Sequence, residues 1–188
     1  RRGARPRRGI RALIDARQPT GWRALRTTLL NERAESIERR AIAQLSEDLA
    51  GAPADCRRMF ELLFSGAIRP YTVRGLATGL GVGASTLLSR FFRAGLPAPK
   101  RYVALARLVR AARLLENAGL SIANVANQLE FSSPQSFGRH VRMMLGVGGQ
   151  QFRETWDGEG LLGAFRRELV LPHLAVLRAF RPCGRWGG

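Results

Sequence analysis

The fold is decided by the stretch FSSPQSFGRHVRMMLGVGGQQF, residues 131–152. Ser133 is a residue type that caps the N-terminus of a helix, and Pro134 suits the first helical position. Gly146 favours the left-handed conformation that ends many helices. Together these signals predict a helix that begins at Pro134 and ends at Leu145.

Helical spacing gives this predicted helix two unlike faces. The inner face is apolar and consists of Phe137, Val141, Met144 and Leu145. The outer face is polar and consists of Gln135, Arg139 and Arg142. Glutamine can pair bidentately with adenine and arginine with guanine, so the outer face suits a DNA major groove. For the helix taken alone, an ordinary solvated face is an equally good interpretation.

A related unit occurs earlier in the chain, where residues 71–93 read YTVRGLATGLGVGASTLLSRFFR. Thr72 is placed to cap a short helix, Gly81 to make a left-handed turn, and Gly83 or Ala84 to open a second helix. A short helix, a glycine turn and a second helix are the layout of a helix-turn-helix.

The two units are copies of one pattern. Residues 125–131 repeat residues 76–82 at an offset of 49, and the following helices align at an offset of 50. One extra residue in the second turn explains the change of offset. An internal duplication is more specific than either copy alone.

Between the copies, residues 99–118 predict a linker helix that starts at Pro99 and is followed by Gly119. From Leu62 to Leu115 the chain has nine basic residues and no acidic residue. A long block of one charge favours a nucleic-acid surface. A rigid helix between two recognition helices suits successive major grooves, which are about 34 Å apart.

The flanking segments leave several interpretations open. Residues 1–11 contain six arginines and predict a disordered arm, a phosphate-tracking tail or the cut end of an upstream domain. Residues 22–50 predict a helix that packs on the core, forms a dimer or ends a missing sensor domain. Residues 55–64 predict a further helix, and residues 161–180 one or two short helices interrupted by Pro172.

Composition limits the function classes. The 188 residues carry a net charge of +17, which favours a polyanionic partner such as nucleic acid. No apolar run approaches the ~18 residues that span a bilayer, and the N-terminus has no secretory pattern, so we expect no membrane partner. Cys56 and Cys183 fit free thiols in a reducing cytoplasm. With only His140 and His173 besides, we expect no metal and no cofactor.

The sequence resembles the AraC family of bacterial transcription regulators over roughly residues 59–153. The most specific matches are Ser121-Ile122, Val125-Ala126, Leu129, Phe131-Ser132, Phe137, Arg139, Gly146-Val147 and Phe152-Arg153. The resemblance implies two helix-turn-helix subdomains that bind an asymmetric duplex near a promoter, with RNA polymerase as a partner. The chain departs from the family pattern at Gly148-Gly149, Val141, Glu130 and Ser89. A left-handed Glu130 costs on the order of 1 kcal/mol.

We therefore expect an all-α fold of two helix-turn-helix subdomains joined by a linker helix, with extra N- and C-terminal helices. The expected parts are a basic arm and helical segment (1–54), the first helix-turn-helix (55–98), the linker helix (99–118), the second helix-turn-helix (119–153) and a C-terminal helical extension (154–188). The expected function is sequence-specific binding of double-stranded DNA by a cytoplasmic, nucleoid-associated transcription regulator. A homodimer through residues outside the DNA-binding core stays open.

The expected site has two classes of residue. Base-reading residues are Gln135, Arg139, Ser136, Ser85 and Ser89, with most recognition on the second copy because the first holds Ser89 where a long polar reader is usual. Phosphate-binding residues are Arg90, Arg93, Arg101, Arg110, Ser133 and Arg142. The first alternative is a non-specific architectural or accessory nucleic-acid-binding protein.

The second alternative is an enzyme with a reactive thiol, since some DNA-repair alkyltransferases carry an AraC-like module. Neither Cys56 nor Cys183 has the histidine or acidic neighbourhood in sequence that activates a thiol. His140 lies beside the buried stripe of its helix and fits a structural role. We therefore expect a protein without catalytic activity.

Overall fold

The computed structural model describes residues 37–66, 68 and 71–184. Within these ranges the chain forms helices and turns and no strand, which confirms the expected all-α fold. The basic segment 1–11 and the first part of the expected helix 22–50 lie outside the described residues.

The N-terminal described segment is helical over residues 37–48. Its apolar stripe is buried in the core of this chain, as shown by Ile37, Ala41 and Leu45, each at most 2% exposed. This part of the expected helix is therefore a packing helix. It is followed by α2 (Ala54–Phe64), close to the bounds that the sequence predicts.

The first helix-turn-helix consists of α3 (Val73–Gly79) and α4 (Ala84–Arg93). As expected, the Thr72 side chain caps α3, accepting a hydrogen bond of 3.0 Å from the backbone N–H of Gly75. Gly81 makes the turn with a φ of 70°, a conformation that glycine adopts without strain.

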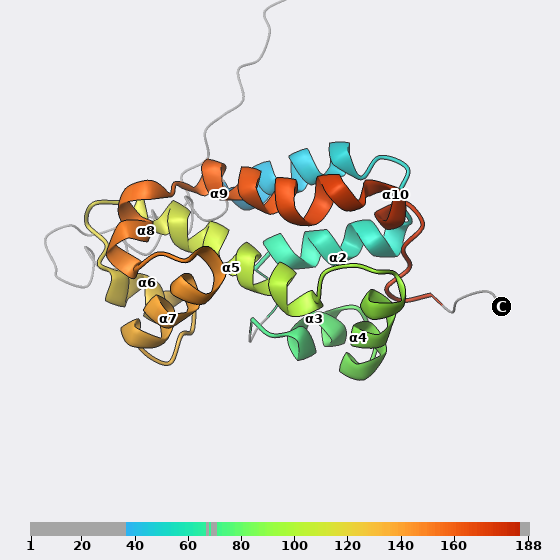
Figure 1. Cartoon of the computed structure of the whole chain (residues 1–188), viewed down its shortest axis with the longest axis horizontal. Coiled ribbons are helices and arrows are strands. Elements are labelled where there is room, and N and C mark those ends of the chain that lie inside the picture. The colour runs from blue at the N-terminus through green and yellow to red at the C-terminus, as the bar shows by residue number, and fades with distance from the viewer. Residues whose placement is uncertain (1–36, 67, 69–70, 185–188) are drawn as a thin grey trace, which may run out of the picture. The chain divides into compact units, whose positions relative to one another are not determined.

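The linker helix α5 (Pro99–Leu115) lies in the middle of the described structure, and the two helix-turn-helix units pack near its opposite ends (Figure 1). The second unit consists of α6 (Ile122–Gln128) and α7 (Pro134–Leu145). The linker helix α5 is buried on nearly all sides, because the four consecutive residues from Tyr102 to Leu105 are each at most 5% exposed. A helix that is buried nearly all round serves as the core element of its fold.

The two copies share backbone geometry as well as sequence. In the first turn the N–H of Val82 donates to the Ala77 carbonyl at 3.0 Å, and in the second the N–H of Phe131 donates to Ala126 at 2.9 Å. Glu130 occupies the place of Gly81 and has a φ of 60°. The duplication in sequence is thus a duplication of structure, with one strained residue in the second copy.

The second helix-turn-helix is followed by α8 (Gly149–Thr155) and α9 (Gly158–Phe165). The chain then forms the π-helical turn η1 (Arg166–Val170), the 3-10 turn η2 (Leu171–His173) and the short helix α10 (Leu174–Leu177). Pro172 lies in the short 3-10 turn η2, so the expected interruption is confirmed. This extension packs on α5 through α9. Its last residues contact α4 of the first helix-turn-helix through Phe180 and Pro182.

Aromatic contacts show how the extension completes the core. Phe165 packs edge-on against Phe64 at 5.1 Å between ring centroids, and Phe180 against Phe91 of α4 at 4.9 Å. A bidentate ion pair adds a polar connection, in which Nε and Nη2 of Arg166 donate to Asp48 at 2.6 and 2.7 Å. The C-terminal extension therefore packs against the buried side of α4 in the first helix-turn-helix.

Candidate nucleic-acid interface

The recognition helix of the second unit, α7, begins and ends as its sequence predicts. The Ser133 side chain caps it by accepting from the backbone N–H of Ser136 at 3.0 Å, and Pro134 follows at the first helical position. Gly146 ends the helix in the left-handed conformation, with a φ of 75°. Both ends of α7 are thus fixed by local sequence, which sets the direction in which its side chains point.

The inner face of α7 anchors the helix. Phe137 and Val141 are fully buried, and the Phe137 ring contacts Phe131 at 5.2 Å and Phe152 at 5.9 Å between centroids. Such edge-on aromatic packing fixes the rotation of a helix about its own axis. Met144 and Leu145, also expected on this face, are half-buried.

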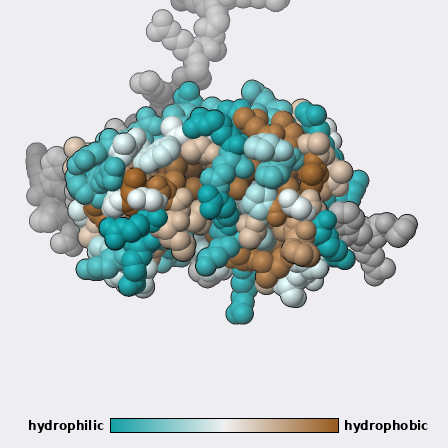
Figure 2. Space-filling model, in the orientation of Figure 1, coloured by the Kyte–Doolittle hydropathy of each residue, from teal (hydrophilic) through white to brown (hydrophobic). Residues whose placement is uncertain are grey.

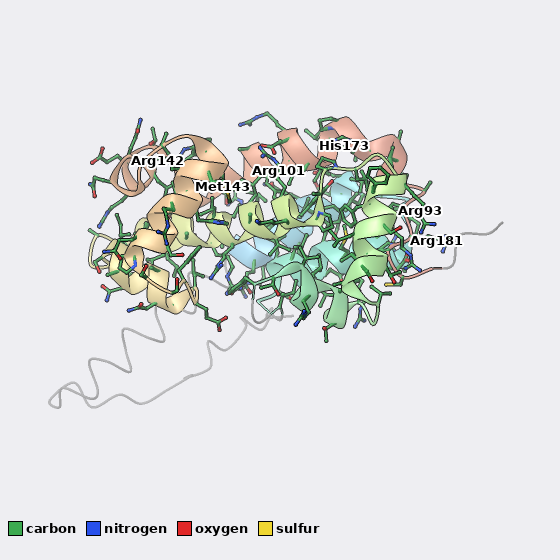
Figure 3. The ribbon with its side chains drawn as sticks, turned by 60° about the horizontal axis from the view of Figure 1, so that its bottom comes forward. Arg93, Arg101, Arg142, Met143, His173 and Arg181 are labelled. Atoms are coloured by element: carbon green, nitrogen blue, oxygen red, sulfur yellow. The ribbon has the colours of Figure 1, made fainter. Side chains whose placement is uncertain are left out.

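The outer face of α7 carries two expected base-reading residues, Gln135 and Arg139, and the expected phosphate-binding residue Arg142. Gln135, Arg139 and Arg142 are exposed, and within the described part of the chain their side chains make no hydrogen bond or ion pair. Figure 3 shows Arg142 extending away from the ribbon on this side of the structure. Ser136 is half-buried next to them. One amide and two guanidinium groups are therefore available to an external partner.

The recognition helix of the first unit, α4, presents a different surface. Leu87 and Phe91 are buried as expected, and Ser85, Ser89 and Arg93 are exposed. Two large apolar side chains are also exposed on α4, Leu88 at 47% and Phe92 at 85%. In Figure 2 hydrophobic surface gathers over α3 and the adjoining part of α4, whereas the surface over α7 is hydrophilic.

Arg90 does not have the role that we expected from the sequence. Its side chain is only 9% exposed, and its Nη1 donates to the backbone carbonyl of Pro182 in the C-terminal extension. A guanidinium that is buried against the protein cannot reach a phosphate in this arrangement. Arg90 is thus corrected to a structural residue that ties the extension to α4.

Arg110 is corrected for the same reason. It is 8% exposed, and its Nη2 pairs with Glu38 at 2.6 Å. Its guanidinium also lies over the Tyr71 ring, 5.6 Å from the centroid. Arg101 is exposed, but its Nε hydrogen-bonds Glu168, and this hydrogen bond raises the pKa of Arg101. Its charge is thus partly neutralised, which weakens its expected attraction for phosphate.

The remaining expected phosphate-binding residues, Arg93, Arg142 and Ser133, keep donor groups that can reach a ligand outside the protein. Arg93 and Arg142 are exposed on the two different recognition helices (Figure 3). Ser133 is half-buried, and its hydroxyl oxygen already accepts the capping hydrogen bond while its hydroxyl hydrogen can still donate outward.

Arg107 of α5 is not among the expected site residues, but the structure places its side chain between the two units. Its Nε and Nη2 both donate to the Leu129 carbonyl, at 3.0 and 2.5 Å. Its guanidinium stacks on Phe131 of the second unit and lies 5.2 Å from the Tyr71 ring centroid of the first unit. The sequence contains one signal for this inward position of Arg107. Residues four apart share a helix face, and Arg107 is four residues after the buried Val103.

The two thiols are not activated. Cys56 is fully buried, and burial, followed by the charge of Asp55, raises its pKa to about 12. The pKa of Cys183 is also raised by burial. Within the described ranges no three His, Cys, Asp or Glu side chains gather as metal ligands, and no helix is long and apolar enough to cross a membrane.

Comparison with protein families gives one match. Residues 76–155 match the family model of a helix-turn-helix domain, which is the AraC-family type. No curated protein and no solved structure matches the chain. The matched residues run from α3 through α5 and α7 to the end of α8, so they contain both recognition helices and the linker between them. Residues 76–155 of this chain are therefore a DNA-binding helix-turn-helix domain of the AraC family, the type found in transcription regulators.

Proposed function

We propose that the chain is a sequence-specific transcription regulator that reads double-stranded DNA mainly through α7. The observation that carries this proposal is the free polar face of α7, where Gln135, Arg139 and Arg142 are exposed on a helix whose other face is locked into the core. A helix of this kind fits the major groove, and its position is fixed before DNA arrives.

The roles on α7 follow from side-chain chemistry. Arg139 would pair bidentately with O6 and N7 of a guanine, and Gln135 with N6 and N7 of an adenine. Ser136 would contact a neighbouring base edge. Arg142 and Ser133 would bind flanking phosphates and so fix the register of α7 on the duplex.

The first recognition helix would contribute position more than sequence. Ser85 and Ser89 are too short for bidentate contacts, and Arg93 would bind a phosphate. The exposed Leu88 and Phe92 would meet thymine methyl groups or sugars. Base discrimination by α4 would accordingly be weaker than by α7.

A salt titration tests this proposal against its alternative. We would select duplexes from a random pool and measure affinity for the preferred and a scrambled duplex between 50 mM and 200 mM salt. A specific regulator retains a preference of about a thousandfold or more at physiological salt. A preference that disappears as salt rises would contradict the proposal.

One observation favours a second function, a non-specific architectural binder. The net charge of +17 supplies affinity for any duplex, and α4 presents two exposed apolar residues in place of base readers. For such a protein the two duplexes would bind with nearly equal affinity throughout the titration, and both affinities would fall along one line of log affinity against log salt.

The proposed function also implies where the protein acts and which partner it meets. A regulator of this type acts on the chromosome in the cytoplasm and meets RNA polymerase at a promoter. Catalysis is not part of the proposal, because the two cysteines have raised pKa values and so little thiolate at neutral pH.

A further inference from the structure

A cavity of about 300 Å³ is formed by the linker helix and both helix-turn-helix units. The start of α3 supplies one wall, α5 a second and α7 a third. The lining residues are Tyr71, Thr72, Val73, Lys100, Val103, Ala104, Arg107 and His140. Because the cavity is shared by both units, a group held in it would contact both at once.

The lining of this cavity is basic. Lys100 is exposed, and Arg107 and His140 are half-buried. No acidic residue is among the lining residues. Burial lowers the pKa of His140, and the positive charges of Arg107 and Lys100 lower it further, which reflects a local excess of positive charge.

The donors in the cavity have capacity for a further acceptor. Arg107 carries five N–H donors, and two of its nitrogens bind the Leu129 carbonyl. The ammonium group of Lys100 is a flexible point charge, and both ammonium and guanidinium groups are common phosphate ligands. His140 differs from these donors, because its ring donates to the backbone carbonyl of Ala104 and its lowered pKa favours the neutral form, in which the buried Nε2 carries no hydrogen to donate. His140 is therefore a neighbour of the site and not a phosphate ligand.

We propose that the cavity between the two helix-turn-helix units binds a phosphate group through Lys100 and Arg107, next to the ring of His140. The phosphate comes either from the DNA backbone or from a free phosphate compound, and the same donors would recognise both. The first source rests on the proposed function, because the minor groove and the two phosphate backbones that flank it lie between two successive major grooves on one face of the duplex. The second source is independent of DNA binding.

The first experiment tests a free phosphate in the absence of DNA. Inorganic phosphate and pyrophosphate are added to the full chain, with chloride at matched ionic strength as the control. The readout is proton NMR of the histidine ring hydrogens, which is simple because the chain has only His140 and His173. Phosphate in the cavity shifts the His140 signals and raises the pKa of that ring, while His173 serves as an internal control.

The matched variants are Lys100→Gln and Arg178→Gln. Each removes one positive charge, but Arg178 follows α10 and does not line the cavity. We expect Lys100→Gln to weaken the phosphate-dependent shift of His140 severalfold, and Arg178→Gln to leave it unchanged.

The second experiment tests the DNA backbone as the source. Single phosphates of the selected duplex are replaced, one at a time, by uncharged methylphosphonates. We expect Lys100→Gln to weaken binding of the unmodified duplex by about three- to tenfold, as the loss of one phosphate contact would. If Lys100 binds one phosphate between the two half-sites, replacing that phosphate removes the advantage of wild type. Wild type and Lys100→Gln should then bind this methylphosphonate duplex with equal affinity.

The two experiments separate the possible results. A His140 shift alone assigns a free phosphate compound, and a single methylphosphonate position that cancels the Lys100 effect assigns the DNA backbone. If Lys100→Gln equals Arg178→Gln in both experiments, the proposal is overturned. A chain that binds no duplex contradicts the proposed function, yet the NMR titration still decides whether the cavity takes phosphate.

Discussion

The guanidinium carbon of Arg107 lies 3.5 Å from the centre of the Phe131 ring. The same guanidinium donates two hydrogen bonds to the carbonyl of Leu129, immediately before the left-handed Glu130. The linker helix thus supports the strained turn of the second helix-turn-helix. The Tyr71 ring of the first unit lies near the same guanidinium, so one side chain connects the three parts of the domain.

Arg107→Lys should therefore destabilise the domain although it keeps the charge. A lysine cannot donate in a fork to one carbonyl while stacking flat on a ring. An incompletely satisfied Leu129 carbonyl and the weaker ring contact should together cost about 1–3 kcal/mol of unfolding free energy. Urea denaturation followed by circular dichroism measures this cost. An unchanged midpoint would show that the fork geometry does not matter.

Glu130→Gly should stabilise the second turn, because glycine adopts a positive φ without the steric cost that Glu130 has at 60°. The matched control is Glu130→Ala, which also removes the carboxylate but retains the Cβ. We expect the glycine variant to exceed the alanine variant by about 1 kcal/mol in unfolding free energy. An alanine variant that is equally stable would rule out strain at this position.

Arg110→Met should unfold the domain rather than weaken DNA binding selectively. The substitution removes the positive partner that Arg110 provides to Glu38, at a site where both side chains are about one-tenth exposed. Breaking a buried ion pair by removing one partner costs about 3–5 kcal/mol. The double variant with Glu38→Leu should recover much of this loss in the same urea titration. If Arg110→Met were as stable as wild type and bound DNA weakly, Arg110 would be a phosphate ligand after all.

Cys56 should resist alkylation in the folded protein. Burial raises its pKa to about 12 from the ordinary value of 9.0, so very little thiolate exists at pH 8. Because the folded state favours the neutral thiol, Cys56 also makes the free energy of unfolding depend on pH. The resulting stabilisation is complete below pH 9 and is lost as the pH rises towards 12. Iodoacetamide labelling at pH 8, with and without urea, checks the prediction, and rapid labelling of Cys56 without urea would contradict it.

Local signals in the sequence predicted most of the second helix-turn-helix. A cap at Ser133, a proline at the first helical position and a glycine stop act within a few residues, so they can be recognised without a structure. The repeat then identified the first unit. Thr72 caps its first helix, and Gly81 makes the left-handed turn that Glu130 makes in the second unit. The exposed readers on α7 followed from helical spacing alone.

Long-range packing explains what the sequence could not predict. Arg90 and Arg110 look like solvent-facing arginines on their helices, but their partners Pro182 and Glu38 are distant in the chain. The role of the C-terminal extension was hidden in the same way, since an apolar helix does not indicate which surface it covers. The basic cavity likewise exists only because three separated helices meet.

Base reading by α7 depends above all on Arg139, so a selection experiment with Arg139 variants decides whether α7 reads bases. Wild type, Arg139→Ala and the control Arg142→Ala would each select from the same random duplex pool, followed by sequencing. Arg139 and Arg142 are both exposed on α7, so either alanine variant should fold, which thermal unfolding would verify. Arg139→Lys adds a variant that keeps the charge but loses the bidentate geometry.

We expect Arg139→Ala and Arg139→Lys to lose the preference for guanine at one position, at a cost of about 1–3 kcal/mol for the preferred duplex. Arg142→Ala should weaken all duplexes by a similar factor and keep their ranking. If Arg139→Ala bound the pool with the same ranking as wild type, the assignment of base reading to α7 would be wrong.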